Sequence, residues 1–81
     1  MYGAANAAVN LGNARTALGR YQEAYKAYGV ALTLFSTLND GVGQADAGMN
    51  MGIALRRLGD FVEAEAHLKD ALVASTDPLS P

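Results

Sequence analysis

The chain has 81 residues, of which 51% are hydrophobic and 17% are charged, and its formal net charge is -2. This composition is typical of one small soluble domain, and the absence of cysteine excludes a disulfide-stapled scaffold and a thiolate zinc finger. Six Lys and Arg residues are too few for a cationic surface that would bind nucleic acid or an anionic membrane. We therefore expect a cytoplasmic protein with no nucleic-acid or membrane partner.

No cationic segment precedes an apolar one at residues 1–6, and no stretch approaches the roughly 18 apolar residues of a membrane span. The dominant feature is instead an internal repeat, because the chain superimposes on itself with an offset of about 40 residues. Nine residues recur: Asn10, Gly12, Ala14, Leu18, Gly19, Glu23, Ala24, Ala31 and Leu32 match Asn50, Gly52, Ala54, Leu58, Gly59, Glu63, Ala64, Ala71 and Leu72. We expect a single domain over 1–81 built from two copies of one unit, at about 4–38 and 42–75, with a tail at 76–81.

Apolar residues at spacings of three and four predict two amphipathic helices in each copy. In chain order, the predicted helices cover about 4–18, 22–38, 42–58 and 61–75. Gly19 and Gly59 are expected to end the first helix of each pair, because glycine adopts the left-handed conformation that closes a helix. The fold class predicted is all-α, with two stacked antiparallel helix hairpins.

Capping residues follow the same division into four helices. Asp60 is a candidate N-cap, with Glu63 three residues later as the second half of a capping box, whereas Arg20 replaces Asp60 in the first copy. Asp40, in the junction between the copies, is a candidate N-cap for the third helix, and Pro78 is expected to stop the fourth helix.

Small residues recur on the apolar stripes of both copies, where they let neighbouring helices approach closely. They are Gly12, Ala24 and Ala31, and Gly52, Ala64 and Ala71. Glycine inside a helix costs about 1 kcal/mol relative to alanine. Its presence at the same place in both copies therefore indicates that close approach offsets that cost. The larger Tyr21, Tyr28 and Phe61 are expected to fill space at the hairpin ends and between the layers.

These runs carry a family resemblance. Asn10-Leu11-Gly12-Asn13-Ala14 through Gly19-Arg20-Tyr21-Gln22-Glu23-Ala24, with the matching residues 50–72, resembles tetratricopeptide repeats over nearly the whole chain. Ala8 and Gly48 stand where an aromatic residue is usual, and the period exceeds the family's usual 34 residues. The longer unit is similar to the extended variety in cell-polarity adaptors of the Pins/LGN type and in bacterial regulators.

The resemblance implies a fragment of a right-handed α-solenoid that acts as a non-catalytic adaptor or scaffold. Its partner, a peptide or a helix, is expected in a concave groove lined by the first helix of each repeat. The groove residues are Asn6, Val9, Asn13, Thr16 and Ala17 in the first copy, and Asp46, Met49, Ile53, Arg56 and Arg57 in the second. Asn13 offers hydrogen bonds to a peptide backbone, the arginines offer ion pairs to carboxylates, and Val9, Met49 and Ile53 offer apolar contacts.

Structural interpretations of the same residues stay open. Asn10, Asn13 and Asn50 can equally bond within the repeat, and Arg56 with Arg57 can be a solvated helix end near the C-terminal dipole. A clamp for the carboxylate tail of a chaperone is disfavoured, because Val9 stands where that clamp needs a lysine and a third repeat is absent.

Enzymatic interpretations have little support. His67 is the single histidine, and no second metal ligand or nucleophile accompanies it in the pattern. The run Gly41-Val42-Gly43 lacks the third glycine of a dinucleotide fingerprint, since Asp46 stands in its place. Asp60, Glu63 and Glu65 have capping roles or, for Glu65, a partner in Lys69. We expect no catalytic residue, no metal and no cofactor.

The ends of the stack suggest a second hypothesis. A helical stack normally needs a polar cap at each end, but Leu68, Leu72 and Val73 would leave an apolar face uncovered. The alternative to an adaptor is therefore a structural self-association module, which forms a homodimer or exchanges hairpins through these residues.

Overall fold

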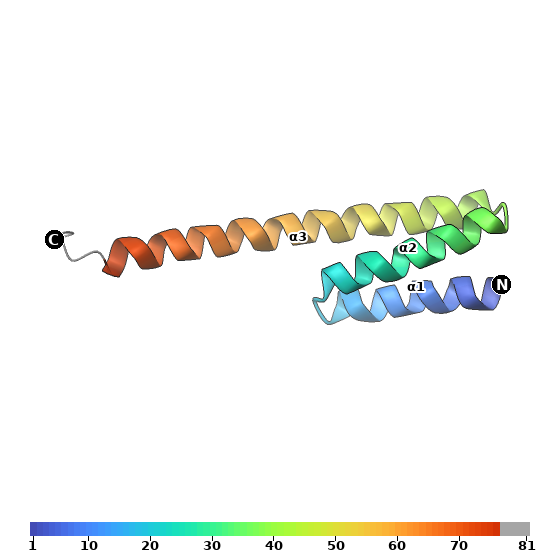
Figure 1. The fold of residues 1–81 in the computed structure, drawn as a ribbon, viewed down its shortest axis with the longest axis horizontal. Coiled ribbons are helices and arrows are strands. Elements are labelled where there is room, and N and C mark those ends of the chain that lie inside the picture. The colour runs from blue at the N-terminus through green and yellow to red at the C-terminus, as the bar shows by residue number, and fades with distance from the viewer. Residues whose placement is uncertain (77–81) are drawn as a thin grey trace.

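A computed structural model describes the backbone of residues 1–76 and the side chains of residues 1–67 and 69. The described chain forms three helices and no strand: α1 (Tyr2–Ala17), α2 (Tyr21–Thr37) and α3 (Gly41–Thr76), shown in Figure 1. The predicted all-α fold is confirmed. The helices lie side by side in the order α1, α2, α3, so that α2 packs against both of its neighbours. The predicted stop at Pro78 lies outside the described residues.

The first hairpin closes at Gly19, as the sequence predicts. Gly19 has φ of +75°, and the N–H groups of Gly19 and Arg20 donate to the carbonyls of Thr16 and Arg15 at 3.0 and 2.8 Å. This pair of bonds satisfies the last carbonyls of α1 and is the usual glycine-terminated helix end. Arg20 provides no side-chain cap for α2, which agrees with the cap that the sequence lacks there.

The junction between the repeats uses asparagine for the same purpose. Asn39 has φ of +56°, and the N–H groups of Asn39 and Asp40 donate to the carbonyls of Ser36 and Phe35. Asp40 then caps α3, because its Oδ1 accepts a 3.0 Å hydrogen bond from the backbone N–H of Gly43. The predicted N-cap at Asp40 is confirmed.

The predicted break at Gly59 is wrong. One unbroken helix of 36 residues, α3, replaces the separate helices predicted over 42–58 and 61–75. Gly59 is helical, so Asp60 does not cap a new helix and forms no capping box with Glu63. Glycine accepts either conformation, and contacts elsewhere in the hairpin therefore decide between them.

Two polar contacts that hold the first hairpin closed cannot form between the equivalent residues of the second repeat. Across α1 and α2, the Tyr28 hydroxyl donates a 2.6 Å hydrogen bond to Oδ1 of Asn13, and Arg15 forms a 3.1 Å ion pair with Glu23. The residues 40 positions later are Leu68, Ile53, Leu55 and Glu63. Leucine and isoleucine cannot make that hydrogen bond, and Leu55 cannot pair with a carboxylate. A turn at Gly59 would therefore lack the polar contacts that accompany the turn at Gly19.

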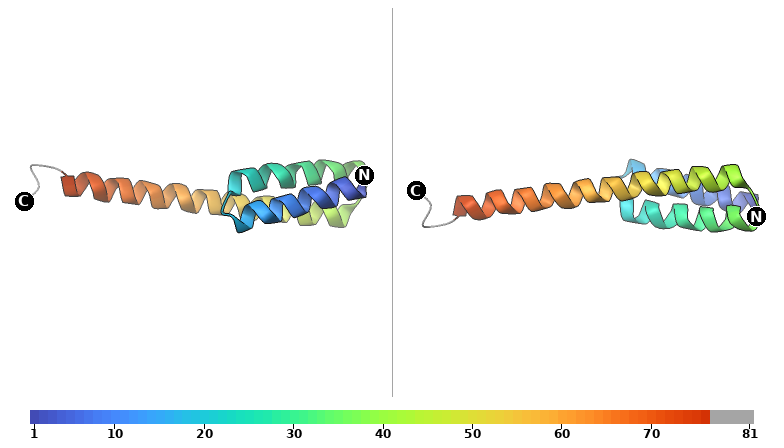
Figure 2. Two further views of the ribbon diagram at one scale, coloured as in Figure 1. Left: turned by 90° about the horizontal axis from the view of Figure 1, so that it is seen from below. Right: turned by 90° about the horizontal axis from the view of Figure 1, so that it is seen from above.

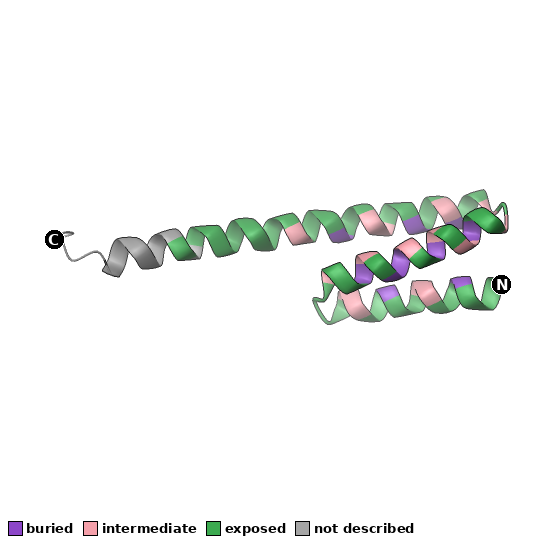
Figure 3. Ribbon diagram, viewed as in Figure 1, coloured by how far each residue is buried: buried purple, intermediate pink, exposed green. Residues whose placement is uncertain are grey.

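Alanines make up most of the core, together with the rings of Tyr28 and Phe35. Ala5 of α1, Ala31 and Phe35 of α2, and Ala47 of α3 make one buried cluster. Burial follows the interface on both sides of α2, while the far part of α3 is exposed wherever its side chains are described (Figure 3). The molecule is an elongated body of 63 × 18 × 13 Å (Figure 2), and its radius of gyration is 18.2 Å. A compact domain of this length would have a radius of gyration of about 12 Å.

Candidate functional site

The groove residues predicted on α1 are partly engaged in holding the first hairpin together. Val9 is half-buried and packs against the core cluster. Asn13 is exposed, but its Oδ1 accepts the hydrogen bond from Tyr28. Thr16 donates to the carbonyl of Gly12 at 2.9 Å, and its hydroxyl oxygen lies 3.3 Å from that of Tyr28. Asn6 and Ala17 are exposed. Because Asn13 and Thr16 form hydrogen bonds within the hairpin, the α1 surface offers a partner fewer free polar groups than the sequence suggests.

On α3 the predicted residues all lie on the exposed surface. We call Asp46, Met49, Ile53, Arg56 and Arg57 the α3 strip. Met49 is 62% exposed and Ile53 is 40% exposed. Spacings of three and four residues place the strip along one side of the helix, with the carboxylate toward its N-terminal end and the guanidinium groups two to three turns later. Among the described side chains, neither arginine of the strip forms an ion pair.

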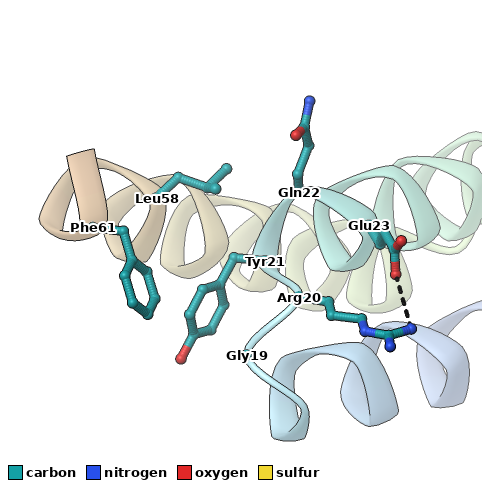
Figure 4. Close-up of a pocket in the computed structure, with 7 residues that line it drawn as sticks. All are labelled: Gly19, Arg20, Tyr21, Gln22, Glu23, Leu58 and Phe61. Atoms are coloured by element: carbon teal, nitrogen blue, oxygen red, sulfur yellow. Dashed lines mark ion pairs between the residues drawn. The ribbon is translucent and has the colours of Figure 1, made fainter. Parts of the chain in front are cut away.

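Two shallow hollows lie where α3 passes the end of the first hairpin. Gly19, Arg20, Tyr21, Gln22, Glu23, Leu58 and Phe61 line the larger one, of 420 Å³ (Figure 4). Tyr21, Arg57, Asp60, Phe61 and Ala64 line the second, of 280 Å³.

The rings of Tyr21 and Phe61 stand together at these hollows, with centroids 5.6 Å apart and a tilt of 37°. The repeat pattern predicts that both rings fill space at the hairpin ends and between the layers. Phe61 is nevertheless 58% exposed, and on the other wall Arg20 and Glu23 form a 3.8 Å ion pair. The repeat offset equates Tyr21 with Phe61 but does not show that these equivalent residues meet. That contact depends on α3 continuing past Gly59.

The self-association residues predicted at Leu68, Leu72 and Val73 lie outside the described side chains. Nearby, the predicted pair of Glu65 with Lys69 is confirmed, with a 3.3 Å ion pair on the exposed surface of α3. His67 is exposed. Among the described residues no three His, Cys, Asp or Glu side chains gather as metal ligands would, and none of the helices combines the length and apolar character of a membrane span.

Comparison with known families identifies the repeat. The family model described as tetratricopeptide repeat matches residues 3–75. Neither the curated proteins nor the solved structures give a match. The matched range covers both copies of the repeat, including the part of α3 beyond Gly59.

Proposed function

Since the chain belongs to the tetratricopeptide repeat family, whose domains generally mediate protein–protein interaction, we propose that it is a non-catalytic module that binds a peptide or partner helix. The groove formed by the first helices of the repeats, α1 and the first half of α3, is the proposed binding surface. The observation that carries this proposal is the α3 strip, where apolar and cationic side chains stand together in solvent.

The chemistry of the strip specifies the partner. Met49 and Ile53 expose apolar surface that a partner can bury, and burial of such surface contributes about 25 cal/mol per Å². Arg56 and Arg57 present guanidinium groups that pair with carboxylates through charge-assisted hydrogen bonds. A peptide with one or two large apolar residues followed by an acidic residue fits this arrangement. On the α1 side of the proposed groove, Asn6 is exposed, whereas the Oδ1 of Asn13 already accepts the hydrogen bond from Tyr28.

We further propose an adaptor or scaffold role, a protein partner and a cytoplasmic location. The repeat offset of about 40 residues supports the extended variety of the family, in which adaptor and scaffold roles occur. The acidic net charge of -2 favours a protein partner over nucleic acid. The proposed location is cytoplasmic, which fits the cysteine-free composition.

Selection of peptides on the immobilised chain tests the proposal. A displayed library of random twelve-residue peptides is selected, and the peptides enriched are synthesised and titrated by fluorescence anisotropy. Arg57→Ala and Ile53→Ser are each expected to weaken binding five- to ten-fold. Lys26→Ala removes the same charge from the exposed surface of α2 and is expected to change affinity less than two-fold.

Two results would oppose this assignment. If Lys26→Ala weakens binding as much as Arg57→Ala, the peptides respond only to the net charge of the chain, and the α3 strip has no specific role. If selected peptides bind equally well to both strip variants and to the parent chain, the binding surface lies elsewhere.

A further inference from the structure

One face of α3 is uncovered although its counterpart on α1 is buried. On α1, the face that packs against α2 includes five buried or half-buried residues, Ala5, Ala8, Gly12, Arg15 and Thr16. The residues 40 positions later are Ala45, Gly48, Gly52, Leu55 and Arg56, and all five are exposed. We call these five residues the open face. Leu55, the largest apolar side chain among them, is 52% exposed.

The space above equivalent glycines on α1 and α3 shows the same difference. A Cβ added at Gly12 would stand 2.5 Å from the ring of Tyr28, so α2 occupies the space directly above Gly12. A Cβ added at Gly52 or at Gly48 would meet nothing within 4 Å. The open face therefore keeps the shallow surface of small residues that admits a closely packed helix, and none of the helices described within residues 1–76 lies on it.

The sequence identifies the helix that fits. Residues 61–76 repeat α2, the helix that covers the corresponding face of α1, with Ala64, Ala71 and Leu72 in the places of Ala24, Ala31 and Leu32. In the unbroken α3 this segment continues straight away from the hairpin (Figure 1), so it cannot reach the open face of its own chain. A second copy can bring the same segment to that face.

We propose that two copies exchange these segments, so that residues 61–76 of each chain cover the open face of the other. The contacts of the first repeat set the register. In the first repeat, Gly12 contacts Tyr28 and Arg15 pairs with Glu23. The midpoints of these two pairs in the sequence are residues 20 and 19. The repeat offset moves this centre to residues 59–60. The two α3 helices then run antiparallel, with the two-fold axis of a self-complementary dimer near Gly59, where the missing side chain permits close approach.

Charge supports the same register. In the first repeat Glu23 pairs with Arg15 across the helices, and Glu63 is the equivalent of Glu23. Leu55 replaces Arg15, but Arg56 is the next residue along the open face. The exchange brings Glu63 of the second copy beside Arg56, once on each side of the axis. Within the described side chains of a single copy, neither of these two residues forms an ion pair.

The exchanged dimer keeps part of the α3 strip available to a peptide. Asn6, Asn13 and Ala17 stay exposed in the first repeat although α2 covers the adjacent face of α1. Their equivalents Asp46, Ile53 and Arg57 therefore stay exposed when a second copy covers the open face. Arg56 has a part in both proposals, but Ile53 and Arg57, whose variants test peptide binding, lie outside the covered surface, so either property can fail in experiment without the other.

Cysteine pairing between differently labelled chains tests the exchange, because the parent chain has no cysteine. One chain carries Gly52→Cys, and a second chain with a size tag carries Leu68→Cys. After mixing and mild oxidation, the proposal predicts a disulfide between the two chains as the main product on a non-reducing gel. A chain with Val30→Cys, whose cysteine lies on the exposed surface of α2, is expected to give at least five-fold less product with Leu68→Cys.

A chain with both Gly52→Cys and Leu68→Cys distinguishes exchange from closure within one chain. Exchange gives a dimer band after oxidation, whereas a hairpin closed at Gly59 gives a bridged monomer, which would overturn the proposal. Equal yields from the matched and control mixtures would also overturn it, because they would mean random collision.

Light scattering over a dilution series gives a second measurement. The parent chain is expected to show twice its own mass at high micromolar concentration, and Leu55→Glu is expected to raise the dissociation constant at least ten-fold. Leu11→Glu introduces the same change on an exposed part of α1 outside the open face and is expected to leave the dimer intact. A monomeric parent chain at these concentrations, or equal effects of the two variants, would overturn the proposal.

Discussion

The ring of Tyr28 lies directly against Gly12, with so little space between the helices that a Cβ at position 12 would stand 2.5 Å from the ring. Tyr28 is buried, and its hydroxyl reaches past Gly12 to donate a hydrogen bond to Asn13. The Tyr28 side chain therefore occupies the space left by the missing Cβ of Gly12 and also bonds to a polar acceptor, Asn13, on α1. This contact fixes how closely the first hairpin closes.

Gly12→Ala is expected to destabilise the chain even though alanine is the better helix former. The added methyl must displace a buried aromatic ring, which costs about 1–3 kcal/mol, and the gain in helix propensity offsets about 1 kcal/mol of that. Gly29→Ala is the matched control, since its Cβ would meet one atom of Met51 at an ordinary 3.8 Å. Urea unfolding followed by circular dichroism should show a lower midpoint for Gly12→Ala only. Similar midpoints for both variants would mean that the ring moves aside freely.

Asn13→Ala is expected to lower stability, in contrast to a residue that serves only in partner binding. Loss of the 2.6 Å hydrogen bond to Tyr28 should reduce the free energy of unfolding by about 0.5–1.5 kcal/mol, and Tyr28→Phe should do the same. The double variant should lose less than the sum of the two single losses, because both remove one interaction. Additive losses in this cycle would show that the hydrogen bond contributes nothing to stability.

The repeat pattern predicts the first hairpin well because its features are local. Gly19 ends α1, Gly12 lies at the interface with α2, and Asp40 caps α3 directly after the hairpin, as glycine, spacing and capping rules indicate. The straight course of α3 could not be predicted from the same rules. Gly59 matches Gly19 in type and position, and the difference lies in the residues that would hold a closed hairpin, such as Leu68 in place of Tyr28.

The candidate site divides in a similar way. Met49 and Ile53, which helical spacing assigns to the groove, are exposed on α3. Helical spacing does not reveal that Asn13 is occupied, because the partner that occupies it, Tyr28, is 15 residues away on the next helix. The open face is also hidden from a single-helix pattern, since it becomes visible only when burial on α1 is compared with exposure on α3.

Asp40→Ala is expected to cost about 0.5–2 kcal/mol, because the backbone N–H of Gly43 loses its capping acceptor. Asp60→Ala is the matched control. Asp60 lies inside the continuous α3, where alanine has the higher helix propensity, so this variant should be neutral or slightly stabilising. Thermal unfolding of both variants checks the pair. A loss of stability at Asp60 equal to that at Asp40 would indicate that a helix begins at residue 60 after all.

The two repeat-equivalent glycines should respond in opposite directions to the same substitution. Gly19 has φ of +75°, a conformation that alanine adopts only with strain, so Gly19→Ala should lower the free energy of unfolding by about 1 kcal/mol or more. Gly59 is helical, and Gly59→Ala should raise it by up to about 1 kcal/mol and increase the helical signal.

Circular dichroism during thermal unfolding, at the lowest protein concentration that gives a usable signal, compares the two variants while limiting any effect of self-association. Destabilisation by Gly59→Ala comparable to that by Gly19→Ala would mean that residue 59 turns in solution as residue 19 does. The second hairpin would then close within one chain, and residues 61–76 would cover the open face without a second copy. Stabilisation by Gly59→Ala would instead keep that segment extended, which is the condition that exchange between two chains requires.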